Sequence, residues 1–534
     1  MIEPNSAPPP PPSDDVPQLT ARAVEECVEL LETICASRAT LANVSRELQN
    51  RLMIAAGRVS RPERHEQRAL SRAVQRKEKR EVREADRAVL ALAGIRQKRL
   101  EPVYVTPDRP ASIEGGGDTF HARASALESS PKNERGEEAL PPLHVARSCY
   151  VCKVRCARMH AFYDHMCAEC GDFNFEKRSQ TADLRGKVAL ISGARVKIGY
   201  QAAVMLLRAG ARVIVTTRFP RDAALRYARE KDFEDFQDRL QIYGLDLRHT
   251  PSVEVFSQLL EQREPRLDFL LHNACQTVRR PTGFYGHLMQ GELGPLSAVP
   301  EPAARLLGDY EHMRSQALRQ LEGGSGLARP ALGLQAAAAL SQVELSAEDR
   351  DTGLEVLPLG ALDADLQQID ERAINSWRLA LDQVSTVELL EVQLVNAIAP
   401  FVLNARLKPL MLKQRTFDKH IVNVSAMEGQ FYRRYKTDKH PHTNMAKAAL
   451  NMMTRTSSSD YARDGIFMNS VDTGWVTDED PLPLAQRKKA DCGFHPPLDI
   501  VDGAARIVDP IFSGFNSGRH VWGQFLKDYK PTAW

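Results

Sequence analysis

The chain has 534 residues, of which 43% are hydrophobic and 26% charged. These values exclude a wholly disordered, a collagen-like or a small disulfide-stapled protein. The 71 Lys and Arg residues nearly balance the 69 Asp and Glu residues, so the net charge of +2 indicates neither nucleic acid nor membrane as a partner. Apolar stretches such as 188–191 and 394–403 are shorter than the roughly 18 residues of a spanning helix, and the start resembles no targeting signal. We therefore expect a cytoplasmic protein that spans no membrane.

The first hundred residues divide into a tail and a helical region. Residues 1–17 contain an unbroken proline run from Pro8 to Pro12, which predicts a solvated, disordered tail. Residues 18–100 are rich in helix formers and place apolar side chains at steps of three and four, interrupted near Pro62. This pattern predicts an α-helical hairpin or small bundle.

The helical region is basic toward its end. Between Arg61 and Leu100 there are 13 Lys and Arg residues against 6 Asp and Glu residues. This excess fits a solvated helix face or a surface for RNA or another anionic partner, and the lack of interleaved aromatic residues favours the first. Residues 101–147, with three glycines from Gly115 to Gly117, are typical of a linker.

A cysteine pattern follows the linker. Five of the nine cysteines lie between Cys149 and Cys170, and Cys149-x2-Cys152 is followed after fourteen residues by Cys167-x2-Cys170. Two such turns can supply four thiolates to a tetrahedral ion, so residues 148–181 are predicted to be a zinc-ribbon-like element with a structural Zn²⁺. Four protein ligands would leave no open position for chemistry on the metal.

Other interpretations of the cysteine region stay open. Cys156, His160 and His165 lie between the two pairs and could replace one cysteine as a ligand or simply lie nearby. Reduced buried thiols without metal, or a redox or catalytic metal, are the alternatives to structural zinc.

From residue 182 onward, short β-rich runs alternate with helical stretches. This alternation predicts an α/β fold, a Rossmann-like doubly wound parallel sheet of about seven strands with helices on both faces. Six strands are expected at 188–191, 213–216, 240–243, 269–271, 421–424 and 467–471.

The first of these strands leads into a turn that contains two glycines. The run from Ser192 to Gly199 is followed by an apolar helix starting near Ala202. A glycine turn between a strand and a helix lets backbone amides approach a pyrophosphate at the positive end of the helix. The middle glycine of the usual dinucleotide pattern is missing here.

Further motifs follow this turn in a fixed order, and in that order they resemble the short-chain dehydrogenase/reductase family over residues 182–534. The motifs are Asp246-Leu247, Asn273-Ala274-Cys275, Asn396 within 395–401, Ile421 to Ser425, Lys447 to Leu450, Asn469 to Gly474, and Thr477. The resemblance implies a nicotinamide-dependent oxidoreductase that moves hydride between the cofactor and a carbonyl or alcohol carbon.

The resemblance also implies a cofactor site. Its residues would be Ser192, Gly193, Arg195, Lys197, Ile198, Gly199, Thr217, Arg218, Asp246, Leu247, Asn273, Ala274, Lys447, Gly474, Val476 and Thr477. Thr217 stands where an NAD site wants a carboxylate, and Arg218 follows it, so NADP(H) is predicted over NAD(H). A surface salt bridge is the alternative role for Arg218.

Two departures from the family concern the active site and the chain length. Thr443 stands four residues before Lys447, where the family has its tyrosine, and Ala426 rather than Ser425 takes the serine position in one alignment. Asn273 and Asn396 are 123 positions apart, which indicates an insertion at about 283–375. Ligands bind at this edge of such sheets, so the insertion is expected to cap the substrate, or else to form an oligomer contact or a loose excursion.

The missing tyrosine requires another proton donor, because a threonine hydroxyl is too weak an acid at neutral pH. We expect Asn396 and Lys447 to keep the roles that the family gives them and Ser425 or Thr443 to orient the substrate oxygen. His442 or Tyr435 would supply the proton. The formal Tyr-x3-Lys pattern from Tyr432 to Lys436 is predicted to be loop.

The sequence thus leaves two functions open. One is an oxidoreductase with a modified active site that acts on a small molecule, and the other is an NADP(H)-binding scaffold or sensor. A homo-oligomer formed through the dehydrogenase-like domain is compatible with both. His272, beside Asn273, is expected to be a packed strand-end residue and not a catalyst.

Overall fold

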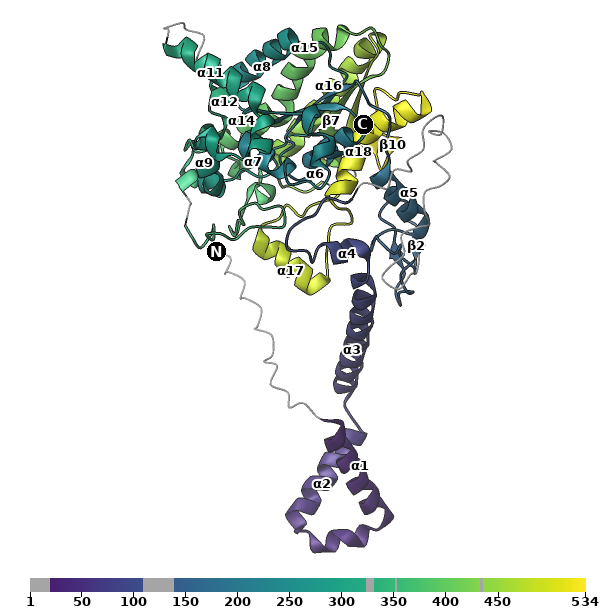
Figure 1. Cartoon of the computed structure of the whole chain (residues 1–534). Coiled ribbons are helices and arrows are strands. Elements are labelled where there is room, and N and C mark those ends of the chain that lie inside the picture. Colours follow the sequence, from purple (N-terminus) through teal and green to yellow (C-terminus); the bar gives the residue numbers. More distant parts are fainter. Residues whose placement is uncertain (1–19, 109–138, 323–330, 351–352, 433–435) are drawn as a thin grey trace, which may run out of the picture. The chain divides into compact units, whose positions relative to one another are not determined.

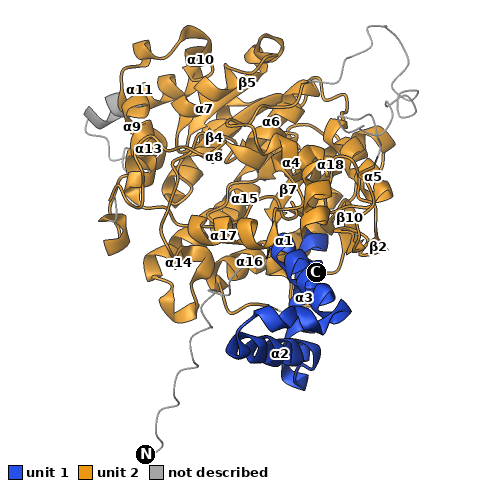
Figure 2. Cartoon of the chain, turned by 90° about the horizontal axis from the view of Figure 1, so that it is seen from below, with its two compact units in different colours: residues 1–83 blue, residues 84–534 orange. Residues whose placement is uncertain are grey.

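A computed structural model describes the chain except residues 1–19, 109–138, 323–330, 351–352 and 433–435 (Figure 1). The predicted tail at 1–17 and most of the predicted linker lie outside the described residues. The chain divides into two compact units, Met1–Arg83 and Glu84–Trp534 (Figure 2). Each unit is described separately.

The first unit is helical. It contains α1 (Ala21–Ala36), the 3₁₀ helix η1 (Arg38–Asn43), α2 (Arg46–Ser60) and the first part of α3 (Arg64–Ala91). Hydroxyl oxygens cap two of these helices, since Thr20 accepts from Ala23 N and Ser45 from Leu48 N. No residue of α1, η1 or α2 is buried, so the described part of this unit has no core of its own.

The second unit is built around one sheet with strand order β10-β9-β8-β7-β6-β3-β4-β5. Seven neighbouring strands run parallel, and β10 is antiparallel to β9. The strands are β3 (Val188–Ser192), β4 (Arg212–Thr217), β5 (Leu240–Gly244), β6 (Phe269–His272), β7 (Lys419–Ser425), β8 (Ile466–Asp472), β9 (Phe525–Lys527) and β10 (Lys530–Thr532). The doubly wound fold class is confirmed.

The sheet has eight strands, one more than the predicted number of about seven. The sequence identified β3 to β8, which are buried runs of four to seven residues. It missed β9 and β10, which have three residues each and are joined by a turn at Asp528 and Tyr529, both with positive φ. Strands this short show no periodicity of their own.

Helices cover both faces of the sheet (Figure 1). On one face α6 (Lys197–Arg208) packs against α18 (Ile500–Ser517). On the other, α8 (Thr250–Arg263) packs against α15 (Ala399–Leu412), and α16 (Pro441–Arg463) packs against β7 and β8. The remaining helices are α4 (Gly94–Lys98), α5 (Ala168–Ser179), α7 (Pro220–Tyr227), α9 (Gly286–Leu293), α10 (Glu301–Arg305), α11 (Gly308–Glu322), α12 (Leu332–Gln335), α13 (Ala337–Leu340), α14 (Thr386–Gln393) and α17 (Leu482–Cys492).

One helical stretch, Thr386–Leu412, has the length and composition of a membrane-crossing helix. It comprises α14, a π-turn at Leu394–Ile398 and α15. Its α15 part packs against α8 and β7, and α14 and the π-turn pack against α16. Core helices of a sheet protein meet the same length and composition criteria, so this stretch is weak support for a membrane span.

The long insertion forms helices that pack beside β5, the strand at one edge of the sheet. The amide of Ile242 in β5 donates to the carbonyl of Leu306, with an N···O distance of 2.9 Å. Tyr310 of α11 lies against Gly244, where a Cβ would come within 2.3 Å of the phenol oxygen. The insertion therefore covers a sheet edge that would otherwise expose backbone donors and acceptors.

The cysteine element shares a small hydrophobic core with part of the sheet domain. A hairpin of β1 (Arg147–Ser148) and β2 (Arg155–Cys156) precedes α5, which packs against α18. Apolar side chains from the element, among them Met159, Tyr163 and Met166, form one buried cluster with Leu498 and others of the sheet domain.

Candidate functional site

The turn from β3 to α6 brings the backbone close to the loop after β6. Gly193 has φ +69°, and a Cβ there would lie 2.6 Å from Cα of Ala274. Asn273 donates from Nδ2 to the carbonyl of Gly193 at 2.9 Å, and a Cβ on Gly199 would collide with the same amide. Only glycine fits these two positions, which leaves the amino end of α6 open to a ligand.

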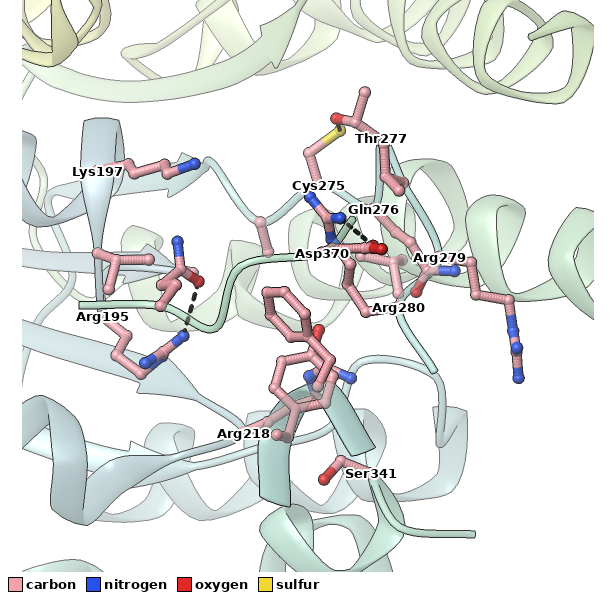
Figure 3. Close-up of a pocket in the computed structure, with 18 of the residues that line it drawn as sticks. Arg195, Lys197, Arg218, Cys275, Gln276, Thr277, Arg279, Arg280, Ser341 and Asp370 are labelled. Atoms are coloured by element: carbon pink, nitrogen blue, oxygen red, sulfur yellow. Dashed lines mark hydrogen bonds and ion pairs between the residues drawn. The ribbon is translucent and has the colours of Figure 1, made fainter. Parts of the chain in front are cut away.

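Lys197 replaces the missing middle glycine of this turn. Its φ is +57°, a left-handed conformation that side-chain-bearing residues rarely adopt. Its ammonium forms no hydrogen bond or ion pair with the described residues and lies at the cavity beside the turn (Figure 3). The strained position therefore places an unpaired cation where a phosphate would approach.

The turn borders a cavity of about 540 Å³. Twelve of the predicted cofactor residues line it: Gly193, Arg195, Lys197, Ile198, Gly199, Thr217, Arg218, Asp246, Leu247, Asn273, Ala274 and Thr477. Ser192, Lys447, Gly474 and Val476 are not among the lining residues. Ser192 lies behind the wall, where its hydroxyl accepts from Ala274 N at 3.1 Å.

Arg218 lies at the end of β4 between aromatic rings. Its guanidinium lies 5.5 Å from the ring centre of Phe219 and 4.7 Å from that of Tyr285, and it donates to the Tyr285 hydroxyl at 2.7 Å. Burial raises the pKa of Tyr285, but the charges of Arg218 and Arg280 lower it below its usual value overall. Among the described residues Arg218 has no carboxylate partner, which argues against a salt bridge as its role.

Asp246, by contrast, is already paired. Its carboxylate accepts from Arg248 at 2.7 Å, and its amide donates to the carbonyl of Gly333 in the insertion at 2.9 Å. Burial raises the pKa of Asp246, but Arg248 and Arg218 hold it below its usual value. The carboxylate that feels the charge of Arg218 is therefore itself paired with Arg248.

The insertion supplies part of the cavity wall that sequence reasoning did not identify. Gln367 accepts from Arg195 at 3.1 Å, and Asp370 pairs with Arg280 (Figure 3). Tyr285 also lines the cavity, from the 3₁₀ helix Thr282–Tyr285 that follows the β6 loop. No motif marks these residues, because their partners lie 67 to 172 positions away in the chain.

None of the predicted catalytic residues in the described part of the chain lines the cavity. Asn396 is buried in the π-turn, where Oδ1 accepts from Gln276 N at 2.7 Å and Nδ2 donates to Gln276 O at 3.1 Å. Gln276 lines the cavity. Asn396 thus lies directly behind the wall and fixes its backbone.

The strand end and the helix that carry the family's catalytic motif are also buried. Lys447 donates from Nζ to the carbonyl of Val424 at 2.8 Å. Thr443 precedes it by one turn of α16, so both lie on one face of the helix. The hydroxyls of Ser425 and Thr443 find no hydrogen-bond partner among the described residues, although both are buried. A buried hydroxyl without a partner costs free energy, so these two groups are candidates for a hydrogen bond to a polar ligand.

The structure describes only one of the two predicted proton donors. His442 is buried at the start of α16, with Nε2 3.3 Å from Oε1 of Glu388 in α14. Tyr435 lies outside the described residues, as does most of the predicted loop from Tyr432 to Lys436. The roles of all these catalytic residues stay predictions.

His272 is packed inside the fold, as expected for a strand-end residue. It is buried at the end of β6, and its Nε2 lies 2.8 Å from Oδ1 of Asn404. Burial lowers the pKa of His272 to about 4, so the ring is neutral at neutral pH. It does not line the cavity.

The four cysteines of the two pairs meet at one point. The sulfurs of Cys149, Cys152, Cys167 and Cys170 all lie within 4.8 Å of one another. Burial opposes ionisation of Cys149, but backbone amides, first that of Cys167, donate to its sulfur and lower the pKa of the thiol to about 7. Four clustered thiols, one of them readily ionised, fit a zinc site.

The other candidate ligands lie outside this cluster. His160 is buried, with Nε2 3.2 Å from Asp172, and its Nδ1 accepts from the amide of Phe162. His165 pairs with Asp164 at 2.7 Å. Cys156 donates from its thiol to the carbonyl of Arg147 at 3.7 Å.

Two family models match this chain. The model described as "short chain dehydrogenase" matches residues 187–285, and the one described as "Enoyl-(Acyl carrier protein) reductase" matches residues 373–490. The segment between the two matches, 286–372, corresponds to the insertion.

Among known proteins, R665 of Acanthamoeba polyphaga mimivirus, an uncharacterized protein, is 30% identical over 71% of this chain and 74% of its own length. Dehydrogenase/reductase SDR family member 13 of Bos taurus is 36% identical over 19% of this chain. Retinol dehydrogenase 14 of Mus musculus is 38% identical over 19% of this chain. The matches to these two dehydrogenases span 27% and 34% of their lengths.

Solved structures resemble the chain at low identity. An NADPH-bound carbonyl reductase from chicken fatty liver is 17% identical, with a TM-score of 0.38 over 66% of this chain and all of that protein. A putative short-chain dehydrogenase/reductase from Burkholderia multivorans with bound NADP is 17% identical, with a TM-score of 0.38 over 65% of this chain and 99% of that one. The family models, the related sequences and the parallel sheet with its glycine turn lead to one conclusion: the chain belongs to the short-chain dehydrogenase/reductase family.

Proposed function

We propose that this protein binds NADP(H) in the cavity and uses it for hydride transfer between the cofactor and a carbonyl or alcohol carbon of a small molecule. The observation that carries the choice of cofactor is Arg218, which follows Thr217 at the end of β4 and has no carboxylate partner among the described residues. A 2′-phosphate needs such a cation, whereas an NAD site needs a carboxylate at the position of Thr217.

The cavity fits a dinucleotide in other respects. Gly193 and Gly199 keep side chains out of the turn, and Lys197 adds a second unpaired cation beside it. The amino end of α6 favours negative charge. Residues around the turn would thus hold the phosphates, and Asn273 would fix the turn through Gly193.

The cofactor supplies the hydride, and the chain must supply orientation and a proton. We assign orientation to Ser425 or Thr443, whose buried hydroxyls lack partners among the described residues, and proton supply to His442 or Tyr435. Lys447 and Asn396 hold the backbone of Val424 and Gln276 on either side of this region. Positioning of this kind contributes to catalysis, because it reduces the reorganisation needed at the reacting atoms.

Mass spectrometry of small molecules that co-purify with the native protein tests this proposal first. We expect NADP⁺ or NADPH in the released fraction. A panel of aldehydes and ketones, assayed by the loss of NADPH absorbance, then tests turnover. Recovery of NAD(H) instead, or of no nucleotide together with no NADPH binding in titration, contradicts the proposal.

A second candidate function is NADP(H) binding without fast chemistry, as in a scaffold or sensor. It is favoured by one observation, that Asn396, Ser425, His442, Thr443 and Lys447, the predicted catalytic residues that the structure describes, do not line the cavity. Tight NADPH binding with no oxidation across the panel would support this alternative over the enzyme. Retention of Asn396, Ser425 and Lys447 together favours the enzyme.

We also propose a structural Zn²⁺ held by Cys149, Cys152, Cys167 and Cys170. The support is the sulfur cluster, whose members lie within 4.8 Å of one another. With four protein ligands the ion would stabilise the fold and take no part in hydride transfer. Metal analysis of freshly purified, reduced protein should find one zinc per chain; none, or two, contradicts the assignment.

A further inference from the structure

The first cysteine turn contacts the loop that closes one side of the cavity. Tyr150 lies between Cys149 and Cys152, and its phenol oxygen accepts from the amide of Trp475 at 3.0 Å. We propose that Tyr150 is a positioning residue for this loop, so that metal occupancy of the cysteine cluster sets the affinity for the cofactor. This inference rests on the proposed NADP(H) site.

Tyr150 is fixed by the metal element itself. Its amide donates to the carbonyl of His165 at 2.7 Å, which joins the first cysteine turn to the second. The amide of Cys167 also donates to the sulfur of Cys149. The position of the phenol is therefore determined by the same two turns that bring the four sulfurs together.

The loop that Tyr150 contacts begins at the end of β8. Gly474 has φ +77°, and a Cβ there would lie 2.4 Å from Cδ1 of Leu498 and 3.1 Å from the Tyr150 oxygen. The amide of Gly474 donates to Oδ1 of Asp472, and the carbonyl of Trp475 accepts from Leu498 N. The backbone at Gly474 and Trp475 is thus held between Tyr150 and Leu498.

The same loop reaches the cavity two residues later. Thr477 lines the cavity, as do residues 478–482. Thr477 donates to Glu479 at 2.5 Å, which gives this segment its own local structure. A shift of the backbone at Trp475 would therefore move the adjoining wall.

Apolar packing links the element to the other side of the cavity as well. Val476 is buried in the same cluster as Cys149, and Ile198 of the glycine turn packs against that cluster. A Cβ on Gly503 would touch both Ile198 and Val476 at 3.0 to 3.2 Å. The core of the cysteine element is thus continuous with the cofactor turn and with the loop.

The test compares Tyr150→Phe with a matched control, Tyr461→Phe. Both variants remove one phenol hydroxyl that hydrogen-bonds to backbone, since Tyr461 donates to the carbonyl of Asn404 at 3.0 Å, and Tyr461 does not line the cavity. We expect Tyr150→Phe to keep its zinc content and weaken NADPH binding about fivefold, the usual effect of one hydrogen bond. Tyr461→Phe should leave the affinity unchanged.

Removal of zinc with a chelator provides the second arm. We expect it to weaken NADPH binding of the unaltered protein, to have a smaller effect on Tyr150→Phe, and to be reversed by added Zn²⁺. The inference is overturned if Tyr150→Phe and the unaltered protein bind NADPH with equal affinity. It is also overturned if the chelator weakens NADPH binding by the same factor in both.

Hydrogen exchange separates this inference from the cofactor assignment. Without cofactor, the amides of residues 473–480 should exchange faster after zinc removal and in Tyr150→Phe than in the unaltered protein. Unchanged exchange in both overturns the inference even if NADPH binds. If the unaltered protein binds no NADPH, the proposed function fails, and the exchange rates alone decide whether Tyr150 positions the loop.

Discussion

Lys197 combines backbone strain with a free charge at the cavity. Its φ of +57° costs about 1 kcal/mol for a residue with a Cβ, whereas glycine adopts this conformation freely. We predict that Lys197→Gly lowers NADPH affinity and leaves the free energy of unfolding unchanged or up to about 1 kcal/mol higher. Denaturant unfolding and cofactor titration check both effects. A clear loss of stability, or undiminished affinity, would contradict this role of Lys197.

Tyr285 is the insertion residue that holds Arg218. Because its hydroxyl accepts from the guanidinium at 2.7 Å, Tyr285→Phe should lower the affinity for NADPH several-fold and that for NADH much less. Tyr310→Phe is a suitable control, since that hydroxyl donates to the carbonyl of Leu334 and the residue does not line the cavity. Equal losses for both cofactors would mean that Tyr285 shapes the cavity without aiming Arg218.

The proton donor can be tested once a substrate is found. We predict that His442→Ala or Tyr435→Phe lowers kcat at least about tenfold, a modest threshold for loss of an acid or base group. If neither variant reaches that threshold, the proton comes from another group.

At the scale of residues, the sequence predicted the lining of the cavity better than the rest of the site. Gly193, Asn273 and Arg218 line the cavity as expected, because their positions depend on neighbours in the chain and on strand ends. Tyr285 and Gln367 were missed, because their contacts to Arg218 and Arg195 join positions far apart in sequence. The burial of His442 against Glu388 could not be predicted either, for the same reason.

At the scale of elements, the cysteine hairpin and α5 depend on the cluster they share. We predict that Cys167→Ser lowers the melting temperature and the zinc content together, because one ligand is lost. Cys156→Ser is the matched control, since this cysteine lies in the same hairpin and outside the sulfur cluster. Similar losses in both variants would show that the thiols act as ordinary buried side chains.

Among the elements, periodicity identified β3 to β8 and failed for the insertion. The buried strands carry continuous apolar runs, which are visible in sequence. The insertion was expected to cap the substrate, or else to form an oligomer contact or a loose excursion, and it does two things that these expectations did not include. The carbonyl of Leu306 accepts a hydrogen bond from the edge strand β5, and Gln367 accepts one from Arg195 in the cavity wall. Both depend on packing between distant segments.

At the scale of the molecule, buried histidines make stability depend on pH. Burial lowers the pKa of His272 to about 4 and that of His420 to about 3, below the unfolded value near 6.5. Below about pH 6.5 the unfolded state therefore binds more protons than the folded state. Stability should be full above pH 6.5 and fall as the pH drops toward 4.

Thermal unfolding between pH 7.5 and 4.5 checks this prediction. His272→Asn removes one titrating group and keeps an amide that can donate to Asn404, so it should flatten the pH dependence of the melting temperature. Each buried histidine contributes at most about 1.4 kcal/mol per pH unit to the slope. A melting temperature that stays constant from pH 7.5 to 4.5 would contradict the neutral, buried state of these rings.

The most direct test of the account as a whole is calorimetric titration of the native protein and of Arg218→Ala with NADPH and NADH. Arg218 is the cavity cation that the choice of cofactor depends on. We predict that the native protein binds NADPH at least about tenfold more tightly than NADH, and that Arg218→Ala removes this preference, because a charge-assisted contact to the 2′-phosphate is lost. Equal affinity of the native protein for the two cofactors, or NADPH binding unchanged in Arg218→Ala, would contradict it.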